Sequence, residues 1–169
     1  VAEVHVVAGG GECKEVLFLC GEAGSETVIH CGAHSFTRRE ETSAMGCYCT
    51  AAGRYLYEPD AALMKAAPYR SICHWYNVEA LDPNTHLYTS DRIVSDFPGR
   101  RFEVLGEVKL SRKAVSAAIP GGRAHVVVRN YPAEADALQR QLGLKEGGEL
   151  FVVATTVGKR PHGFLCARF

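Results

Sequence analysis

The chain has 169 residues, enough for one sizeable domain or two small ones with a buried core. Hydrophobic residues make up 47% and charged residues 22% of it, as in soluble globular proteins, and no apolar run approaches the roughly 18 residues of a membrane-spanning helix. The sequence begins with Val rather than Met and shows no signal-peptide pattern. We therefore expect a piece of a longer cytoplasmic protein.

The first fifty residues are predicted to be mainly β-structure. Residues 4–7, 12–20 and 26–32 have the composition of strands, and three glycines (9–11) separate the first two. A glycine loop that binds phosphate or S-adenosylmethionine leads from a strand into a helix, whereas another strand-like segment comes next here. The favoured interpretation is therefore a hairpin turn. Residues 34–53, rich in Ser, Thr and Gly, are predicted to be a loose connection.

A helical segment is predicted over 58–76, because Pro59 suits a helix start and good helix formers come after it. Pro68 should break or end that helix. The remainder predicts a strand (101–110), a short helix capped by Ser111 (111–122), a strand (123–130), a helix ended by Gly143 (131–144) and two closing strands joined by a hairpin. We expect an α/β (α+β) fold whose second part runs α-β-α-β-α-β-β, with a parallel core and an antiparallel last strand.

The seven cysteines are odd in number and follow no disulfide spacing, which predicts reduced and mostly buried thiols. Metal-ligand residue types gather at His30, Cys31, His34, Cys47 and Cys49, but their spacing does not fit two close zinc-binding pairs, so no metal site is predicted. No motif frames a nucleophilic cysteine or a pair of catalytic carboxylates. We predict no catalytic residue and no bound cofactor in this chain.

The net charge of zero conceals an asymmetry. Residues 1–50 carry three Lys/Arg against seven Glu, a net charge of −4, whereas 98–129 hold seven basic and two acidic residues. A basic block of this kind favours an anion-binding face, although a solvated Lys/Arg-rich surface also fits. The guanidinium fork of Arg suits phosphate. The expected phosphate contacts are Arg100, Arg101, Lys109, Arg112, Lys113, Arg123 and Arg129, with Lys159 and Arg160 at the rim.

Three stretches carry a resemblance to a known family: YLYEPDAALMKAAPYRSI, NTHLYTSDRIVSDFPGRRFEV and VVVRNYP with the later LQRQLGLKEGGELFVVATT. They resemble the THUMP-like C-terminal domain of bacterial class I S-adenosylmethionine-dependent methyltransferases. The start, VAEVHVVAGGGECKEVLFLC, is similar to the small ferredoxin-like module that precedes it there. The resemblance implies a ferredoxin-like module over 1–50 and a THUMP-like domain over 51–169.

The resemblance also implies a function. The parent protein would be an RNA-modifying enzyme that uses S-adenosylmethionine, with its catalytic domain upstream, and this part would bind structured RNA (tRNA or rRNA) and present it. The chain has neither a cofactor-binding glycine loop nor an Asn/Asp-Pro-Pro-aromatic motif, so we do not expect it to catalyse methyl transfer alone. The alternative is a docking domain that stabilises the methyltransferase core without contacting RNA. A small enzyme with a Cys/His pair is a third, less favoured interpretation.

Overall fold

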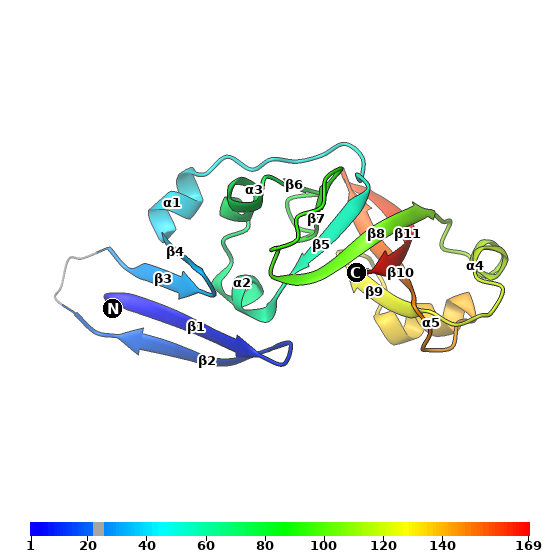
Figure 1. Cartoon of the computed structure of the whole chain (residues 1–169), viewed down its shortest axis with the longest axis horizontal. Helices are drawn as coiled ribbons and strands as arrows, with labels where there is room; N and C mark the ends of the chain where they lie inside the picture. The colour runs from blue at the N-terminus through cyan, green and yellow to red at the C-terminus, as the bar shows by residue number, and fades with distance from the viewer. Residues whose placement is uncertain (22–25) are drawn as a thin grey trace.

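The computed structural model describes residues 1–21 and 26–169, which form two β-sheets with helices between and beside them (Figure 1). A four-stranded sheet of order β2-β1-β3-β4 lies at one end of the molecule, and a seven-stranded sheet of order β6-β7-β5-β8-β11-β10-β9 forms the rest. This mixed arrangement confirms the expected α+β fold class. Among the described residues, no helix is both long and apolar enough to cross a membrane.

The four-stranded sheet consists of β1 (Glu3–Gly9), β2 (Glu12–Leu19), β3 (Val28–Cys31) and β4 (His34–Thr37). The glycine-rich turn joins β1 to β2 as an antiparallel hairpin, which confirms that prediction. β1 pairs in parallel with β3, so that His5 stands opposite His30. Because side chains alternate along a strand, Val6 and Cys31 face the core while these two histidines face away from it.

The prediction of a loose connection over 34–53 is wrong for its first ten residues, which form β4 and α1 (Arg38–Ser43). The helix begins with a capping box: the Thr37 hydroxyl accepts a hydrogen bond from the Glu40 backbone N–H at 3.2 Å, and the Glu40 carboxylate accepts one from the Thr37 N–H at 2.6 Å. The Thr-x-x-Glu spacing was the sequence signal for this helix.

The predicted helical segment over 58–76 starts too early. Residues Tyr55–Pro59 form strand β5, every residue of which is buried, and Pro59 ends this strand rather than starting a helix. Asp60 then caps α2 (Ala61–Ala66) by accepting a hydrogen bond from the Leu63 N–H at 3.0 Å. As predicted, Pro68 separates α2 from the next helix, α3 (Ser71–Tyr76).

The two helices lie between the sheets and join them into one core (Figure 1). Leu63 of α2 and Ile72 of α3 pack in the same buried cluster as Val6 and Phe36 of the four-stranded sheet and Tyr57 of β5. The sheet built by the first fifty residues therefore shares its core with the rest of the chain.

The seven-stranded sheet adds a run of short and long elements to β5. They are β6 (Glu79–Ala80), β7 (Tyr88–Ser90), β8 (Gly99–Glu107), α4 (Arg112–Ala118), β9 (His125–Arg129), α5 (Ala135–Leu142), β10 (Leu150–Val157) and β11 (Arg160–Arg168). The predicted caps are confirmed: the Ser111 hydroxyl accepts a hydrogen bond from the Ala114 N–H, and Gly143 ends α5 in the left-handed conformation.

The parallel core is smaller than predicted, because among the described strands of the seven-stranded sheet β9 and β10 are the one parallel pair. β11 inserts between β10 and β8 and is antiparallel to both, so β8 pairs with neither β9 nor β10. The expectation of successive parallel strands from 101 onward is therefore wrong for β8. A hairpin strand that fills the gap satisfies the backbone groups of β8 as well as a parallel neighbour would.

The sheet curls so that its last strands return towards its first. The Asn130 side-chain amide, just after β9, donates to the Thr85 hydroxyl at 3.1 Å, and the Gly158 N–H, just after β10, donates to the Leu81 carbonyl at 3.1 Å. Apolar residues fill the inside of the curl: Leu56, Leu81, Leu87, Phe102, Val127, Val153, Val157, Phe164 and Cys166. Helices α4 and α5 cover the other face of β9 and β10.

Candidate anion-binding site

A buried carboxylate lies at the end of the curled sheet where β5 finishes and β8 begins. Glu58 points to the same side of β5 as Leu56, towards the inside of the curl, and only 4% of its side chain is exposed. Gly99 allows β8 to approach β5 closely at this point. A Cβ at that position would lie 2.0 Å from the Glu58 carbonyl oxygen, and the residue has φ = 132°. Gly99, which pairs with Pro59, is therefore where the two strands come into closest contact.

Two arginines that were predicted to contact phosphate meet at this carboxylate. The Arg100 Nε donates to one Glu58 oxygen, and Arg129 Nη2 lies 2.5 Å from the other. Arg100 is opposite Glu58 in the β5–β8 register, whereas Arg129 stands at the end of β9 and reaches it only because the sheet curls. The Arg129 Nε is buried and forms no hydrogen bond with any residue of the described ranges. We define Glu58, Arg100 and Arg129 as the Glu58 cluster.

A cavity of about 670 Å³ opens beside the Glu58 cluster. Arg168, at the end of β11, lines it as a third arginine, and Asp60 lines it as a second carboxylate. Three guanidinium groups against two carboxylates leave a net charge of +1, and part of the Asp60 carboxylate is already engaged as the cap of α2. The cavity is thus suited to an anionic group such as a phosphate.

The other predicted contacts are distributed over the molecule. Arg101 faces the opposite side of β8, where it donates to the Ser95 carbonyl and stacks over Phe169. Arg123 donates to the Glu146 carbonyl at 3.2 Å, and Arg112 lies over Gly143 at the end of α5. Lys109 lines a second cleft, of about 600 Å³, with Pro161 and His162 of the β10–β11 hairpin.

Within the part of the chain that the structure describes, the predicted contacts outside the Glu58 cluster form no ion pair. They are Arg101, Lys109, Arg112, Lys113, Arg123, Lys159 and Arg160. Sequence reasoning missed Glu58 and Arg168. The signal for Glu58 was a single charged residue inside a strongly apolar strand, whereas Arg168 is brought to the cavity only by the pairing of β11 with β8.

The residues weighed for zinc do not come together. Cys31 faces the core, where burial raises the pKa of its thiol to about 11, and Cys49 lies in a different cluster with its pKa likewise raised to about 11 by burial. His34 stacks on Trp75, with ring centroids 4.2 Å apart, and its Nε2 lies 2.6 Å from the Tyr76 hydroxyl. Raised thiol pKa values oppose metal binding, since the thiolate is the ligand. All seven cysteines are free.

The glycine-rich turn was also weighed as a cofactor loop. Because it connects two antiparallel strands and leads into no helix, it lacks the N-terminal N–H groups that would hold a phosphate or the carboxylate of S-adenosylmethionine. Gly10 and Gly11 have φ values of 62° and 81°, as the tight turn requires. The residues of this turn do not fit that cofactor.

Two known domain families match the chain, one over the first strands of the seven-stranded sheet and one over the remaining strands. Residues 55–98 match the model of a ferredoxin-like domain, and residues 99–168 match the model of a THUMP domain-like region. The chain thus contains a ferredoxin-like and a THUMP-like domain. The first match lies downstream of residues 1–50, where the ferredoxin-like module was expected, and the division of the chain at residue 50 stays a prediction.

Curated relatives carry the name of an enzyme class. Two uncharacterised S-adenosylmethionine-dependent methyltransferases of Mycobacterium tuberculosis, from strains CDC 1551 / Oshkosh and ATCC 25618 / H37Rv, are each 30% identical to the chain over 115 residues. The match covers 66% of this chain and 32% of each relative. The chain thus spans about a third of the length of the curated relatives that it matches.

A solved structure resembles almost the whole chain. It belongs to a protein of Porphyromonas gingivalis W83 that is designated provisionally as a methyltransferase, and it has a TM-score of 0.83 and 30% sequence identity. The similarity covers 98% of this chain and 45% of that protein. The four-stranded sheet, which neither domain match includes, is therefore part of the shared architecture.

Proposed function

We propose that this chain is the RNA-binding part of an S-adenosylmethionine-dependent RNA methyltransferase, whose catalytic domain precedes it in the parent protein. The names of the curated relatives and their greater length support a methyltransferase with further domains. The THUMP-like match supports an RNA substrate, because THUMP domains generally serve RNA-modifying enzymes. In this proposal the parent protein is cytoplasmic and its partner is structured tRNA or rRNA.

The observation that carries the proposal is the convergence of Arg100, Arg129 and Arg168 on one cavity. Glu58 holds the first two in place, and the third is exposed and forms no ion pair with any residue that the structure describes. Three positioned guanidinium groups fit the phosphate backbone of a nucleic acid, whereas base-specific recognition would need further groups.

A fluorescence titration of the chain with tRNA and rRNA fragments at several salt concentrations tests the proposal. A complex dominated by phosphate contacts weakens as salt rises. The substitution Arg168→Ala should reduce affinity for all fragments and lower the slope of log K against log salt by about one. The matched control is Arg39→Ala, which removes an exposed arginine of the four-stranded sheet region that pairs with Glu26.

The RNA proposal is contradicted if the chain does not bind RNA or if binding does not depend on salt. It is also contradicted if Arg168→Ala and Arg39→Ala lose the same amount of RNA affinity. Arg168 is preferred to Arg100 or Arg129 for this test, because removing either of those leaves the buried Glu58 with an incomplete set of partners. For the same reason, a variant in which Arg100 and Arg101 are both replaced by Glu would lose stability as well as RNA affinity, so the two effects could not be separated.

A second function, docking on the catalytic domain without RNA contact, is favoured by one observation. Leu17 and Leu19 are about half exposed, at 49% and 51%, and they stand opposite His5 and Glu3 on the outward face of the four-stranded sheet. Exposed apolar groups of this kind mark contact surfaces. In the parent protein, slower hydrogen exchange of β1 and β2 than in the isolated chain, together with no RNA binding by the chain, would favour this function.

A further inference from the structure

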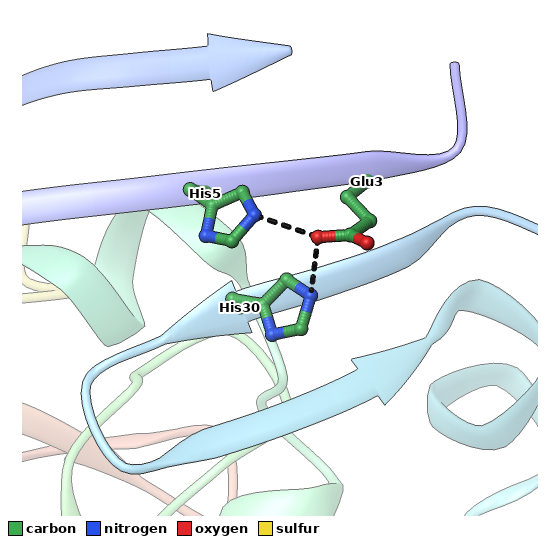
Figure 2. A group of neighbouring side chains, drawn as sticks. All are labelled: Glu3, His5 and His30. Carbon is green, nitrogen blue, oxygen red and sulfur yellow. Dashed lines mark hydrogen bonds and ion pairs between the residues drawn. The ribbon is translucent and has the colours of Figure 1, made fainter. Parts of the chain in front are cut away.

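The outward face of the four-stranded sheet carries a cluster of two histidines and one glutamate that the proposed function does not use. Glu3 and His5 project from the same side of β1, since they are two residues apart, and His30 projects beside them from β3. Figure 2 shows both imidazole rings directed at the Glu3 carboxylate. We define these three residues as the Glu3 cluster.

The distances within the Glu3 cluster suit a shared cation. The Glu3 Oε2 atom lies 2.9 Å from His5 Nε2 and 3.3 Å from His30 Nε2, and all three ligand atoms lie within 4.8 Å of one another. Zinc–ligand bonds of about 2.0–2.1 Å in a tetrahedron place two ligand atoms about 3.3 Å apart. The donor atoms therefore need only small movements to bind one ion.

Hydrogen bonding holds one ring nitrogen of His30 and leaves the other available. The His30 Nδ1 lies 2.7 Å from the Ser35 hydroxyl of the neighbouring strand β4, whereas its Nε2 is buried, lies near the Glu3 carboxylate and forms no hydrogen bond within residues 1–21 and 26–169. A histidine that binds a metal through Nε2 typically has its other nitrogen held by a second residue in this way. His30 is thus oriented with its free nitrogen towards the carboxylate.

The backbone fixes the relative position of the two rings. His5 and His30 are register partners in the parallel β1–β3 pair, and their rings stack with centroids 4.3 Å apart and an angle of 16° between planes. The side chains of Glu3, His5 and His30 are 44%, 34% and 32% exposed, so the remaining coordination positions are open to water. The net charge of −4 over residues 1–50 adds a favourable field for a cation.

We propose that Glu3, His5 and His30 form a binding site for a divalent transition-metal ion of the zinc type. Two imidazoles and one carboxylate are a ligand set that such ions prefer, whereas Mg²⁺ and Ca²⁺ prefer oxygen ligands. The ion links β1 to β3 and keeps a position for water or another ligand on the outward face. The proposal is independent of the RNA-binding function.

Histidine-ring NMR spectra of the whole chain, recorded during titration with Zn²⁺ or Mg²⁺, test the site. At one equivalent of Zn²⁺ the Nε2 signals of both His5 and His30 should shift, and Mg²⁺ should leave them unchanged. The internal control is His162, whose Nδ1 pairs with Glu107 at 2.6 Å without a third ligand in the described residues. Because the readout is specific to each ring, zinc bound to exposed thiols such as Cys20 is distinguished.

Calorimetric titration of variants measures the contribution of each ligand. Glu3→Gln and His30→Ala should each weaken Zn²⁺ binding by more than tenfold, and Ser35→Ala by about tenfold, since outer partners of metal ligands contribute about 10–100-fold. His162→Ala should leave the affinity unchanged. Circular dichroism checks that each variant is folded, and Ser35→Ala, which removes no ligand, still tests the site if a ligand variant unfolds.

The proposal is overturned if His5 and His30 do not shift at one equivalent of Zn²⁺, or if His162 shifts as strongly as they do. It is also overturned if Zn²⁺ affinity is the same in Glu3→Gln as in the unmodified chain.

Discussion

The Glu58 cluster and the Glu3 cluster have the same arrangement, in which one carboxylate lies between two basic side chains, but the two carboxylates differ in exposure. Glu58 is 4% exposed and bound by two arginines, whereas Glu3 is 44% exposed and contacted by two histidines. Arginine is always charged, so it can compensate a buried carboxylate permanently. Histidine can give up its proton and offer a lone pair instead.

This difference in burial suggests a difference in role. A buried charge without its partner is costly, so breaking the Glu58 cluster destabilises the folded sheet. The partners of an exposed carboxylate can exchange for water at little cost, so the Glu3 cluster can rearrange around a ligand. The first cluster positions arginines, and the second has ligand atoms to offer.

The largest expected effect comes from removing each carboxylate in turn. Glu58→Ala leaves two adjacent guanidinium groups uncompensated and should lower the free energy of unfolding by about 3 kcal/mol, the lower end for a broken buried pair because both arginines are partly exposed. Glu3→Ala should change it by less than about 1 kcal/mol when metal ions are chelated. Urea unfolding of both variants measures the contrast, and equal losses would remove the distinction between the clusters.

A second contrast lies within strand β8. Gly99→Ala places a Cβ against the Glu58 carbonyl oxygen in a backbone conformation that disfavours side chains, and should destabilise the protein by about 1–3 kcal/mol. The control is Gly106→Ala in the same strand, where an added Cβ meets no atom within 4 Å. Thermal unfolding of both variants tests this; if Gly99→Ala unfolds no earlier than Gly106→Ala, the close approach of β5 and β8 is not required.

A smaller effect is the dependence of stability on pH that follows from a buried thiol. Burial inside the curled sheet raises the pKa of the Cys166 thiol from 9.0 to about 12. Above pH 9 the unfolded chain releases this proton while the folded chain retains it, so stability falls as pH rises towards 12. Between pH 9 and 10 the loss from this thiol approaches about 1 kcal/mol.

Urea midpoints of the unmodified chain and of Cys166→Ala at pH 8 and pH 10 isolate this effect. The variant is less stable at both pH values, but its midpoint should fall less between them. Equal falls in the two proteins would show that the Cys166 thiol does not contribute to the alkaline loss.

Local sequence signals predicted much of the chain correctly, because several elements depend on residues close to them. Glycines formed the first hairpin, Pro68 separated two helices, and Ser111 and Gly143 marked helix ends. By contrast, β5 was missed because it is buried on both faces, so no apolar–polar alternation reveals it.

The candidate sites depend on pairings that local signals do not encode. Arg100 and Arg129 were predicted to contact phosphate, but their meeting at Glu58 results from the curl of the sheet. His5 and His30 come together through the register of two parallel strands 25 residues apart in sequence. Sequence reasoning found two arginines of the first site, but it found neither Glu58 and Arg168 nor the second site.

The position of β11 has a consequence for biosynthesis. This strand lies between β8 and β10, yet it is later in the chain than every other strand of its sheet. While a ribosome is still translating residues 160–168, β8 and β10 each expose an unpaired edge, which is a template for association with other nascent chains. The seven-stranded sheet is therefore completed only after these residues emerge, and the time before that is when the protein is most exposed to misassembly.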